Sequence, residues 1–348
     1  MSVFDLASFD DHEAVHVFDD VRSGLRAIIA VHSTHLGPAA GGCRYWQYAD
    51  SEAAMVDALR LSRGMSYKNA LAELPVGGGK AVILKRATYP KSDALLEAFG
   101  TMVDSLGGRY VTAEDVGITD ADMSVVSRKT HFVSGLPVEE DAAGGNPGPF
   151  TAEGVFLGMR AAVRRRLGRE GFKGVHVAIQ GLGSVGKVLA EHLAADGAKL
   201  TVADIDERRA AKLAGELRAT VASTEDILFT EADVLAPCAL GAVLNEETIP
   251  KLNVEIVAGA ANNQLRTPDD GQRLYDRGIL YAPDYVVNAG GIINVMAEYL
   301  GDGDVDAVRK RIAKIEGRVE NLLARAEAEG TPTNFVADQM AREAIGRG

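Results

Sequence analysis

The chain has 348 residues, with 37 Lys plus Arg against 49 Asp plus Glu, which gives a formal net charge of −12 at pH 7. At ~150 residues per domain this length predicts two domains, and a 47% hydrophobic share with a 25% charged share excludes a disordered or collagen-like chain. The acidic balance excludes a nucleic acid or an anionic membrane surface as a partner, because both reward clustered Lys and Arg.

In chain order, the first 140 residues alternate apolar, strand-like runs with helical patterns, which is typical of an α/β domain. Ser51 is placed to cap the longest helix, and Glu52 stands in its first turn, where the helix dipole favours an acid. We therefore predict an N-terminal α/β domain over residues 1–140. Its expected strands are 25–32, 80–85 and 110–113, and its expected helices are 51–71 and 93–106.

A run of Gly, Pro, Asn and acidic residues at 138–149 has no periodicity and is the expected hinge. Beyond it, strands and helices follow the βαβ order of a doubly wound parallel sheet, the Rossmann fold. We predict this second domain over 141–330, a last segment 331–348 that returns to the first domain, and a cleft between the domains. The expected strands are 175–180, 199–204, 234–236, 255–258 and 279–282, and the expected helices are 151–166, 184–195, 207–219 and 316–328.

A glycine-rich loop follows the strand 175–180 and opens the next helix, which is the context that makes a GxGxxG motif specific. The first glycine makes the tight turn, the second admits a pyrophosphate, and the third packs the helix on the strand. Asp204, at the end of the next strand, suits a ribose 2′-hydroxyl and repels a 2′-phosphate, so the sequence predicts NAD. Arg208 and Arg209 nearby keep NADP as the alternative. The loop residues are Gly181, Leu182, Gly183, Ser184, Val185 and Gly186.

A second glycine run precedes Lys80. The segment 75–80 resembles a Walker loop, but Leu74 and Ala81 stand where that motif needs Gly and Ser or Thr, so no phosphate cradle is expected. We expect the glycines to turn tightly and to leave room around Lys80 for a small substrate. Lys68 and Lys80 are each also explained as solvated surface residues. If both lysines lie in one cleft, however, the charge of each disfavours protonation of the other, which allows one of them to be a neutral amine.

Three further segments have both a plain and a functional interpretation. Asp115, in segment 112–117, follows the strand 110–113 at the edge where α/β sheets place ligands, although loop capping also explains an acid there. Segment 259–263 ends another strand, and a turn-forming Asn pair is its plain interpretation. Segment 36–42 equally fits an ordinary loop.

Taken together, these motifs closely resemble the leucine, phenylalanine and valine dehydrogenases of the glutamate dehydrogenase superfamily, and leucine dehydrogenases most of all. The resemblance covers almost the whole chain, in order. The matching segments are RGMSYKN with Lys68, GGGK with Lys80, TAEDVG with Asp115, GLGSVG at 181–186, APCALG at 236–241, GAANNQ at 259–264 and NAGGIIN at 288–294.

The resemblance implies the NAD-dependent, reversible oxidative deamination of an apolar L-amino acid to its 2-oxo acid and ammonia. It implies that a hydride leaves the α-carbon, that water activated by Lys80 adds to the iminium, and that Asp115 is the acid/base partner. It also implies that Lys68 binds the α-carboxylate. The other implied contacts are Gly41 and Gly42 at the carboxylate, Asn262 at the amine, Thr151 at the nicotinamide carboxamide, and Cys238 and Ala239 at the cofactor.

By the same resemblance, apolar residues line the pocket for the substrate side chain. The pocket holds no cation for a γ-carboxylate, which disfavours glutamate and favours leucine and other branched-chain amino acids. Ala40 stands where leucine dehydrogenases usually carry Leu, so phenylalanine or tryptophan is the alternative, because one methylene changes selectivity by only ~1 to 3 kcal/mol. The pocket residues are Ala40, Met65, Ala113, Ile292 and Val295.

Two other classes of protein fit the same outline. A non-catalytic sensor of NAD and amino acids would be expected to lack Lys80 or Asp115, and a folate dehydrogenase of related fold would lack both of them and Lys68. The presence of all three favours the enzyme. The resemblance also implies a homo-oligomer, either a dimer or an octamer.

Cysteine usage and hydropathy indicate the compartment. Cys43 and Cys238 are too few and too far apart for a disulfide framework or a metal site, so we expect no metal and a reducing cytoplasm. No apolar run of ~20 residues predicts a membrane span, and residues 1–20 lack the basic start of a secretion signal.

Overall fold

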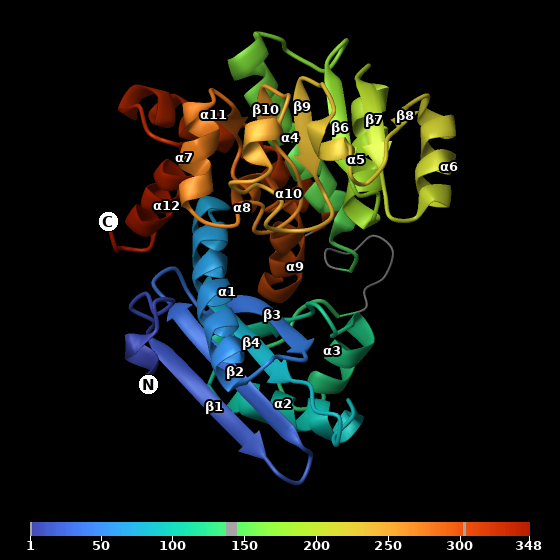
Figure 1. The fold of residues 1–348 in the computed structure, drawn as a ribbon. Coiled ribbons are helices and arrows are strands. Elements are labelled where there is room, and N and C mark those ends of the chain that lie inside the picture. The colour runs from blue at the N-terminus through green and yellow to red at the C-terminus, as the bar shows by residue number, and fades with distance from the viewer. Residues whose placement is uncertain (1, 137–144, 302–303) are drawn as a thin grey trace. The chain divides into compact units, whose positions relative to one another are not determined.

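The computed structural model describes residues 2–136, 145–301 and 304–348, so most of the predicted hinge and the predicted domain boundary at residue 140 lie outside the described residues. The chain divides into two compact units, each built on its own sheet (Figure 1). The first unit comprises Met1–Gly145, Asn294–Val308 and Ala341–Gly348, and the second comprises Asn146–Ile293 and Arg309–Met340. The two-domain α/β fold class predicted from the sequence is confirmed.

The sheet of the first unit is mixed. Its strand order is β1-β2-β4-β3-β5, with antiparallel pairing from β1 to β4 and parallel pairing from β4 to β5. Two of these strands, β1 and β3, were missing from the sequence prediction, because β1 is a half-exposed edge strand and β3 contains two glycines, which disfavour strands in isolation. The bounds are β1 (Ala14–Asp20), β2 (Leu25–Ser33), β3 (Ala39–Trp46), β4 (Gly77–Leu84) and β5 (Tyr110–Ala113).

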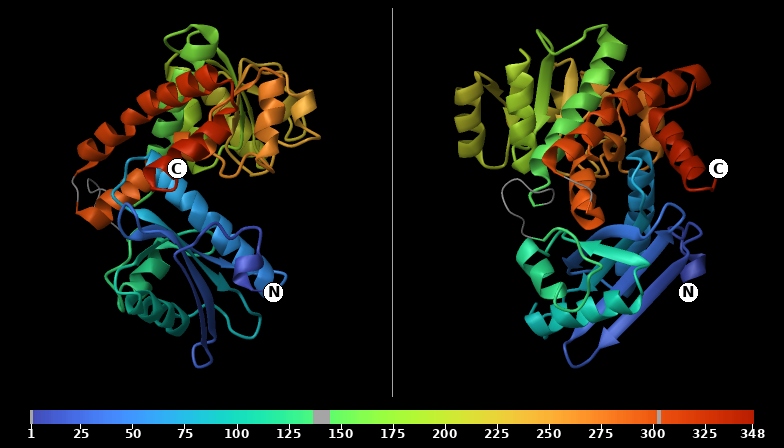
Figure 2. Two further views of the ribbon diagram at one scale, coloured as in Figure 1. Left: turned by 90° about the vertical axis from the view of Figure 1, so that its left-hand side faces the viewer. Right: turned by 180° about the vertical axis from the view of Figure 1, so that it is seen from behind.

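Helices cover both faces of this sheet. In the left view of Figure 2, α1 (Ser51–Leu71) lies on one side, and α2 (Asp93–Ser105) and α3 (Asp120–Val126) lie on the other. Because side chains alternate along a strand, Ile28 of β2 packs toward α1 while Ile29 packs toward α2. The predicted cap of α1 was one residue late. The carboxylate of Asp50, not the side chain of Ser51, accepts a hydrogen bond from the Ala53 amide at 2.8 Å.

The sheet of the second unit is parallel throughout the described residues. Its strand order is β11-β10-β9-β6-β7-β8. The chain adds strands outward from β6 on one side and then outward from β9 on the other, as in a doubly wound sheet. In such sheets ligands bind at the carboxyl ends of the two strands where the order changes, here β6 and β9. The bounds are β6 (His176–Gln180), β7 (Lys199–Ala203), β8 (Thr220–Val221), β9 (Val234–Pro237), β10 (Ile256–Val257) and β11 (Leu280–Tyr281).

The helices of the second half begin with α4, which packs against α5 and α11. The last part of the chain is divided between the units, because α9, α10 and α12 each begin in one unit and end in the other. No helix in the described part of the chain is long and apolar enough to span a membrane. The bounds are α4 (Gly148–Leu167), α5 (Ser184–Ala195), α6 (Glu207–Leu217), α7 (Asp269–Asp276), α8 (Asp284–Val287), α9 (Gly290–Leu300), α10 (Val305–Ile312), α11 (Lys314–Glu329) and α12 (Thr333–Ala344).

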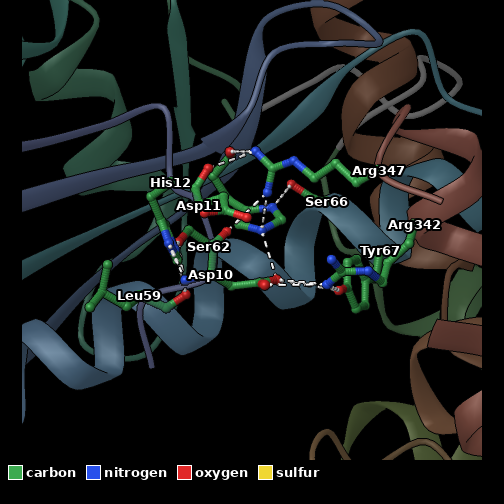
Figure 3. Close-up of polar contacts among 10 residues, drawn as sticks. Asp10, Asp11, His12, Leu59, Ser62, Ser66, Tyr67, Arg342 and Arg347 are labelled. Carbon is green, nitrogen blue, oxygen red and sulfur yellow. Dashed lines mark hydrogen bonds and ion pairs between the residues drawn. The ribbon is translucent and has the colours of Figure 1, made fainter. Parts of the chain in front are cut away.

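Two arginines near the C-terminus bind the N-terminal part of the first unit (Figure 3). Arg342 Nη1 donates to Asp10 Oδ1 at 3.2 Å and to the Tyr67 hydroxyl at 3.3 Å. Arg347 Nη1 donates to Nε2 of His32 at 2.9 Å, and Nη2 donates to the His32 carbonyl at 2.8 Å. These contacts explain why the last residues of the chain belong to the first unit.

Candidate active site

Lys80 and Asp115 meet in the first unit. Lys80 lies in β4 with a buried side chain, and its Nζ donates a hydrogen bond to Oδ2 of Asp115, which follows β5. The two strands are not neighbours, because β3 lies between them in the sheet. The ion pair therefore crosses above β3, and the two residues predicted to be catalytic are in direct contact.

Glycines in β3 make this crossing possible. A Cβ on Gly42 would lie 2.4 Å from the Glu114 carbonyl oxygen and 3.0 Å from Asp115 Cβ. Ala40 of β3 pairs with Gly78 of β4, and Cys43 pairs with Ala81. Gly41 and Gly42, which lie between them, have no partner in β4, so the ladder is interrupted there. Both glycines remain paired with β5, and the Gly41 carbonyl oxygen accepts a hydrogen bond from the buried Tyr110 hydroxyl at 2.5 Å.

The glycine run before Lys80 does not form the tight turn that the sequence predicted. Gly77, Gly78 and Gly79 are the first residues of β4. Glycine is needed there because the neighbouring helix leaves no room for a side chain: a Cβ on Gly78 would lie 2.0 Å from the Ser66 amide nitrogen of α1. Helix α1 therefore packs its backbone directly on β4.

The close packing of α1 places the other predicted residues of the first unit. Lys68 is in the last turn of α1, and Met65 lies one turn earlier on the same face. Met65 Cγ is 3.1 Å from where a Cβ on Gly41 would stand, and Gly42 pairs with Ala113 of β5. Ala40 and Ala113 are buried.

Val295 of the predicted pocket also belongs to the first unit. Its carbonyl oxygen accepts a hydrogen bond from the Ser134 hydroxyl at 2.6 Å. One turn later, the two carboxylate oxygens of Glu298 accept hydrogen bonds from the Gly135 and Leu136 amides at 3.0 and 3.1 Å. This part of α9 is therefore fixed to the segment that follows β5.

Arg44 is a charged residue of this site that the sequence analysis missed. It shares a face of β3 with Gly42, and its Nε donates to Asp115 Oδ2 at 3.3 Å. Burial would raise the pKa of Asp115, but the positive charges of Lys80 and Arg44 hold that pKa below the usual range of an aspartate. Asp115 is therefore ionised at neutral pH. Alternate residues of a strand share a face, so a predicted β3 would have placed Arg44 beside Gly42. Arg44 was missed because β3 itself was not predicted.

In the second unit, the glycine loop has the tight backbone geometry that its motif predicts. Gly181 has φ +95°, and a Cβ on Gly186 would lie 2.0 Å from the Gly181 carbonyl oxygen. Gly183 caps α5 without a side-chain hydrogen bond, and a Cβ there would meet no atom within 4 Å. Uncapped amides at a helix N-terminus beside open space fit the pyrophosphate of a dinucleotide.

Asp204 lies against this loop. Its Oδ2 accepts a hydrogen bond from the Leu182 amide at 2.6 Å, and its Oδ1 accepts from the Asp206 amide at 2.9 Å and from Arg209 Nη1 at 3.2 Å. Burial would raise the pKa of Asp204, and the two amides with Arg209 lower it overall. The carboxylate is therefore ionised, and Arg208 makes no part of these contacts.

Two of the other residues predicted to contact the cofactor lie at these strand ends, and a third lies in α4. The Cys238 amide donates to the Gln180 carbonyl oxygen at 2.7 Å, which holds the end of β9 beside the end of β6. Ala239 follows, with its Cβ 2.7 Å from where a Cβ on Gly181 would stand. Thr151 Oγ1 donates to the Pro147 carbonyl oxygen at 2.9 Å in the first turn of α4.

Asn262 and Ile292 complete the predicted set in the second unit. Asn262 Oδ1 accepts a hydrogen bond from Nδ2 of the buried Asn288 at 2.9 Å, and the same nitrogen donates to the Ala260 carbonyl oxygen at 3.0 Å. Asn288 thus fixes the orientation of the Asn262 amide. Ile292 is half-buried in the first turn of α9. Among the described residues, no group of three or more His, Cys, Asp or Glu is arranged to hold a metal ion.

Comparisons with known proteins show the family to which the chain is similar. Residues 12–132 match the family "Glu/Leu/Phe/Val dehydrogenase, dimerisation domain", and residues 201–344 match "Glutamate/Leucine/Phenylalanine/Valine dehydrogenase". The chain is 46% identical to a leucine dehydrogenase of Geobacillus stearothermophilus over 99% of this chain and 94% of that one. It is 48% identical to a valine dehydrogenase of Streptomyces albus over 95% and 92%. The crystal structure of an L-tryptophan dehydrogenase from Nostoc punctiforme superposes with a TM-score of 0.86 at 43% identity, covering 97% and 96% of the two chains.

Proposed function

The chain belongs to the Glu/Leu/Phe/Val dehydrogenase family, and from this membership we propose that it catalyses the NAD-dependent, reversible oxidative deamination of a branched-chain L-amino acid. The products are the 2-oxo acid and ammonia. The observation that carries the proposal is the ion pair between Lys80 and Asp115, which places an amine that can transfer a proton against an ionised acid. A sensor on the same scaffold has no use for that pair.

Substrate binding falls to groups with the right charge. Lys68 supplies a positive charge for the α-carboxylate, and the backbone of Gly41 and Gly42 supplies groups without a partner in β4. Asn262 Oδ1 accepts one hydrogen bond from Asn288 and keeps a second lone pair, with which it can accept from the substrate amine. We therefore assign Asn262 to the amine, as the sequence resemblance implies.

Proton handling falls to Lys80 and Asp115. Bound NAD supplies the acceptor for the hydride that leaves the substrate α-carbon. Asp115 takes a proton from the substrate ammonium, and the neutral amine of Lys80 takes one from the water that adds to the iminium. The carbinolamine collapses when Lys80 passes its proton to the nitrogen and then takes the proton of the hydroxyl, so that the C–N bond breaks as the C=O bond forms. Asp115 protonates the departing ammonia, and the proton left on Lys80 goes to water. The residues thus provide position and proton transfer, and no covalent bond to the protein is needed.

The choice of amino acid rests on apolar side chains. Ala40, Met65, Ala113 and Val295 in the first unit and Ile292 in the second carry no charge to receive a γ-carboxylate, which disfavours glutamate. Similarity to leucine and valine dehydrogenases over nearly the whole chain supports a branched-chain substrate. The similarity to a tryptophan dehydrogenase, together with the small Ala40, favours an aromatic substrate as the second candidate.

A rate panel tests the proposal. NADH formation is followed with Leu, Val, Ile, Met, Phe, Trp and Glu, and the preferred substrate is then repeated with NADP. We expect the highest kcat/KM with Leu, Val or Ile and weak activity with NADP, because the ionised Asp204 repels a 2′-phosphate. A preference of about tenfold for Phe or Trp would establish the second candidate instead, and no amino-acid-dependent reduction of NAD would refute the dehydrogenase.

We also propose a cytoplasmic homo-oligomer. Both cysteines are free thiols in the structure, as a reducing compartment favours. The match of residues 12–132 to a family described as a dimerisation domain supports self-association. Light scattering in solution distinguishes a monomer, a dimer and an octamer.

A further inference from the structure

Arg44 joins two carboxylates that come from different parts of the first unit. Its Nε donates to Asp115 Oδ2 at 3.3 Å, and its Nη1 donates to Asp57 Oδ2 on α1 at 3.0 Å. Asp57 Oδ2 also accepts a hydrogen bond from the Tyr48 hydroxyl at 2.6 Å. Arg44, Asp57 and Asp115 are each about one-quarter exposed, so water screens these charges only partly.

Asp115 Oδ2 therefore receives two cations, Lys80 Nζ and Arg44 Nε. The two differ in chemistry, because a lysine amine can give up its proton whereas a guanidinium stays charged at any working pH. If Lys80 alone faced Asp115, the carboxylate would lose its counter-charge whenever Lys80 became neutral. Arg44 is placed to supply a positive charge that does not change during the reaction.

We propose that Arg44 is a positioning residue of the dehydrogenase reaction, holding the Asp115 carboxylate in place and ionised while Lys80 releases and regains its proton. This inference rests on the proposed function, since it assigns a proton-transferring role to Lys80. Arg44 touches neither of the bonds that change. It acts through Asp115, and its second contact, to Asp57, anchors the guanidinium to α1.

Asp57 balances the positive charge of Arg44. Counted with Lys80 protonated, the two cations of the group offset the two carboxylates, Asp57 and Asp115. Removing Arg44 leaves Lys80 and Asp115 in a more negative electrostatic field, which raises the pKa values of both groups. Removing the charge of Asp57 has the opposite effect, because Arg44 then acts on Asp115 without a competing acid. The two substitutions should therefore move the pH dependence in opposite directions.

Other ionisable groups near Asp115 set the background for this test and remain unchanged in it. They lie on the strands, on the loop that contains Tyr48 and on the loop of Asp115 itself. The unchanged groups whose charges interact with Asp115 or with its cations are Cys43, Tyr48, Lys80, Tyr110 and Glu114.

The test is the pH profile of kcat/KM for the amino acid in the full-length protein. With Arg44→Met we expect the acid limb to move to higher pH by about one unit and kcat to fall about 100-fold, because Asp115 is no longer held in place. With Asp57→Asn we expect the acid limb to move to lower pH. Arg44→Lys keeps the charge but loses the two-pronged contact, so the limb should stay near that of the wild type while kcat falls.

Arg26→Met is the matched control. Arg26 lies on β2 of the same sheet and is also paired with an acid, since its Nε is 3.1 Å from Asp19 Oδ2, but both side chains are about half exposed. We expect its pH profile and kcat to equal those of the wild type. Thermal melting of each variant shows whether a loss of activity reflects unfolding.

The outcomes separate the two proposals. A wild-type protein without amino-acid-dependent NADH formation refutes the proposed function itself. If the wild type is active but the pH profiles of Arg44→Met and Asp57→Asn equal that of the wild type, or both shift in the same direction, the inference is overturned. Arg44 is then only part of a structural ion pair. If Arg44→Met does not fold, the direction of the shift in Asp57→Asn decides alone.

Discussion

Gly42 of β3 leaves no room for a side chain beside Asp115, because a Cβ on Gly42 would lie only 3.0 Å from Asp115 Cβ. Gly42→Ala would push the Glu114 and Asp115 backbone away, because its Cβ would also lie 2.4 Å from the Glu114 carbonyl oxygen. We expect kcat for the amino acid to fall about 100-fold, as a displacement of about 1 Å at the ion pair would cause. Steady-state kinetics measure this loss.

Gly64→Ala is the control for this substitution. Gly64 lies in the middle of α1, and a Cβ there would meet no atom within 4 Å. We expect activity to be unchanged and stability to rise by about 0.5 kcal/mol, because alanine favours a helix. Equal losses in both variants would show that the contact at Asp115 does not matter.

Lys80 has the proposed proton-transfer role, so Lys80→Ala should lower kcat by about 1,000-fold. The dissociation constant of NAD should stay the same, because Lys80 is in the unit that lacks the glycine loop. Fluorescence titration with NADH and turnover assays separate the two effects. Lys85→Ala, at an exposed position just beyond β4, should leave both values unchanged. Turnover of Lys80→Ala near that of the wild type would contradict the assignment.

Alanine substitutions at two glycines of the dinucleotide loop should affect different properties, stability at one and NAD binding at the other. A Cβ on Gly186 would lie 2.0 Å from the Gly181 carbonyl oxygen, so Gly186→Ala should lower the melting temperature even without a ligand. A Cβ on Gly183 meets no protein atom within 4 Å, so Gly183→Ala should melt like the wild type. It should nevertheless bind NAD about tenfold more weakly, because the pyrophosphate uses that space. Unchanged binding in Gly183→Ala would place the pyrophosphate elsewhere.

His32 should make the protein less stable in acid. Its Nε2 lies 2.9 Å from Arg347 Nη1 and 3.3 Å from Asp10 Oδ2, and its Nδ1 lies 2.7 Å from Ser66 Oγ. Because a guanidinium only donates, the shorter contact makes Nε2 an acceptor, so the ring is neutral and Nδ1–H donates to Ser66. Burial and the charge of Arg347 lower the pKa of His32 from 6.5 to about 3. The unfolded chain therefore binds the extra proton between these two pH values.

Since the folded-state pKa is the lower one, this contribution is fully present above pH 6.5 and is lost as the pH falls toward 3. Each pH unit in that window should cost up to about 1.4 kcal/mol of unfolding free energy. Denaturant titrations across the window measure the slope. His32→Gln, which keeps a donor and an acceptor, should flatten it, whereas His131→Gln at an exposed site should not. An unchanged slope in His32→Gln would assign the acid sensitivity to other groups.

Much of the fold follows from local signals. The helices α1, α2 and α5 and the strands β5 and β6 lie within a residue or so of the predicted ranges, because their periodicity and flanking residues are contained within each segment. Strand β3 was missed because Gly41 and Gly42 hide its pattern, and no helix was predicted for the last segment, which contains α12. In β3, tertiary packing outweighs the propensity of the segment.

The sequence alone determined the α/β class, the dinucleotide loop and the family, because these are written in short motifs and in the periods of helices and strands. Only the tertiary structure decided that Lys80 touches Asp115, and that Arg44, 71 residues before Asp115, holds the same carboxylate oxygen. The physical reason is that such contacts depend on the order of strands in the sheet and on which face of β3 each residue occupies. Neither property is encoded by residues that are neighbours in the chain.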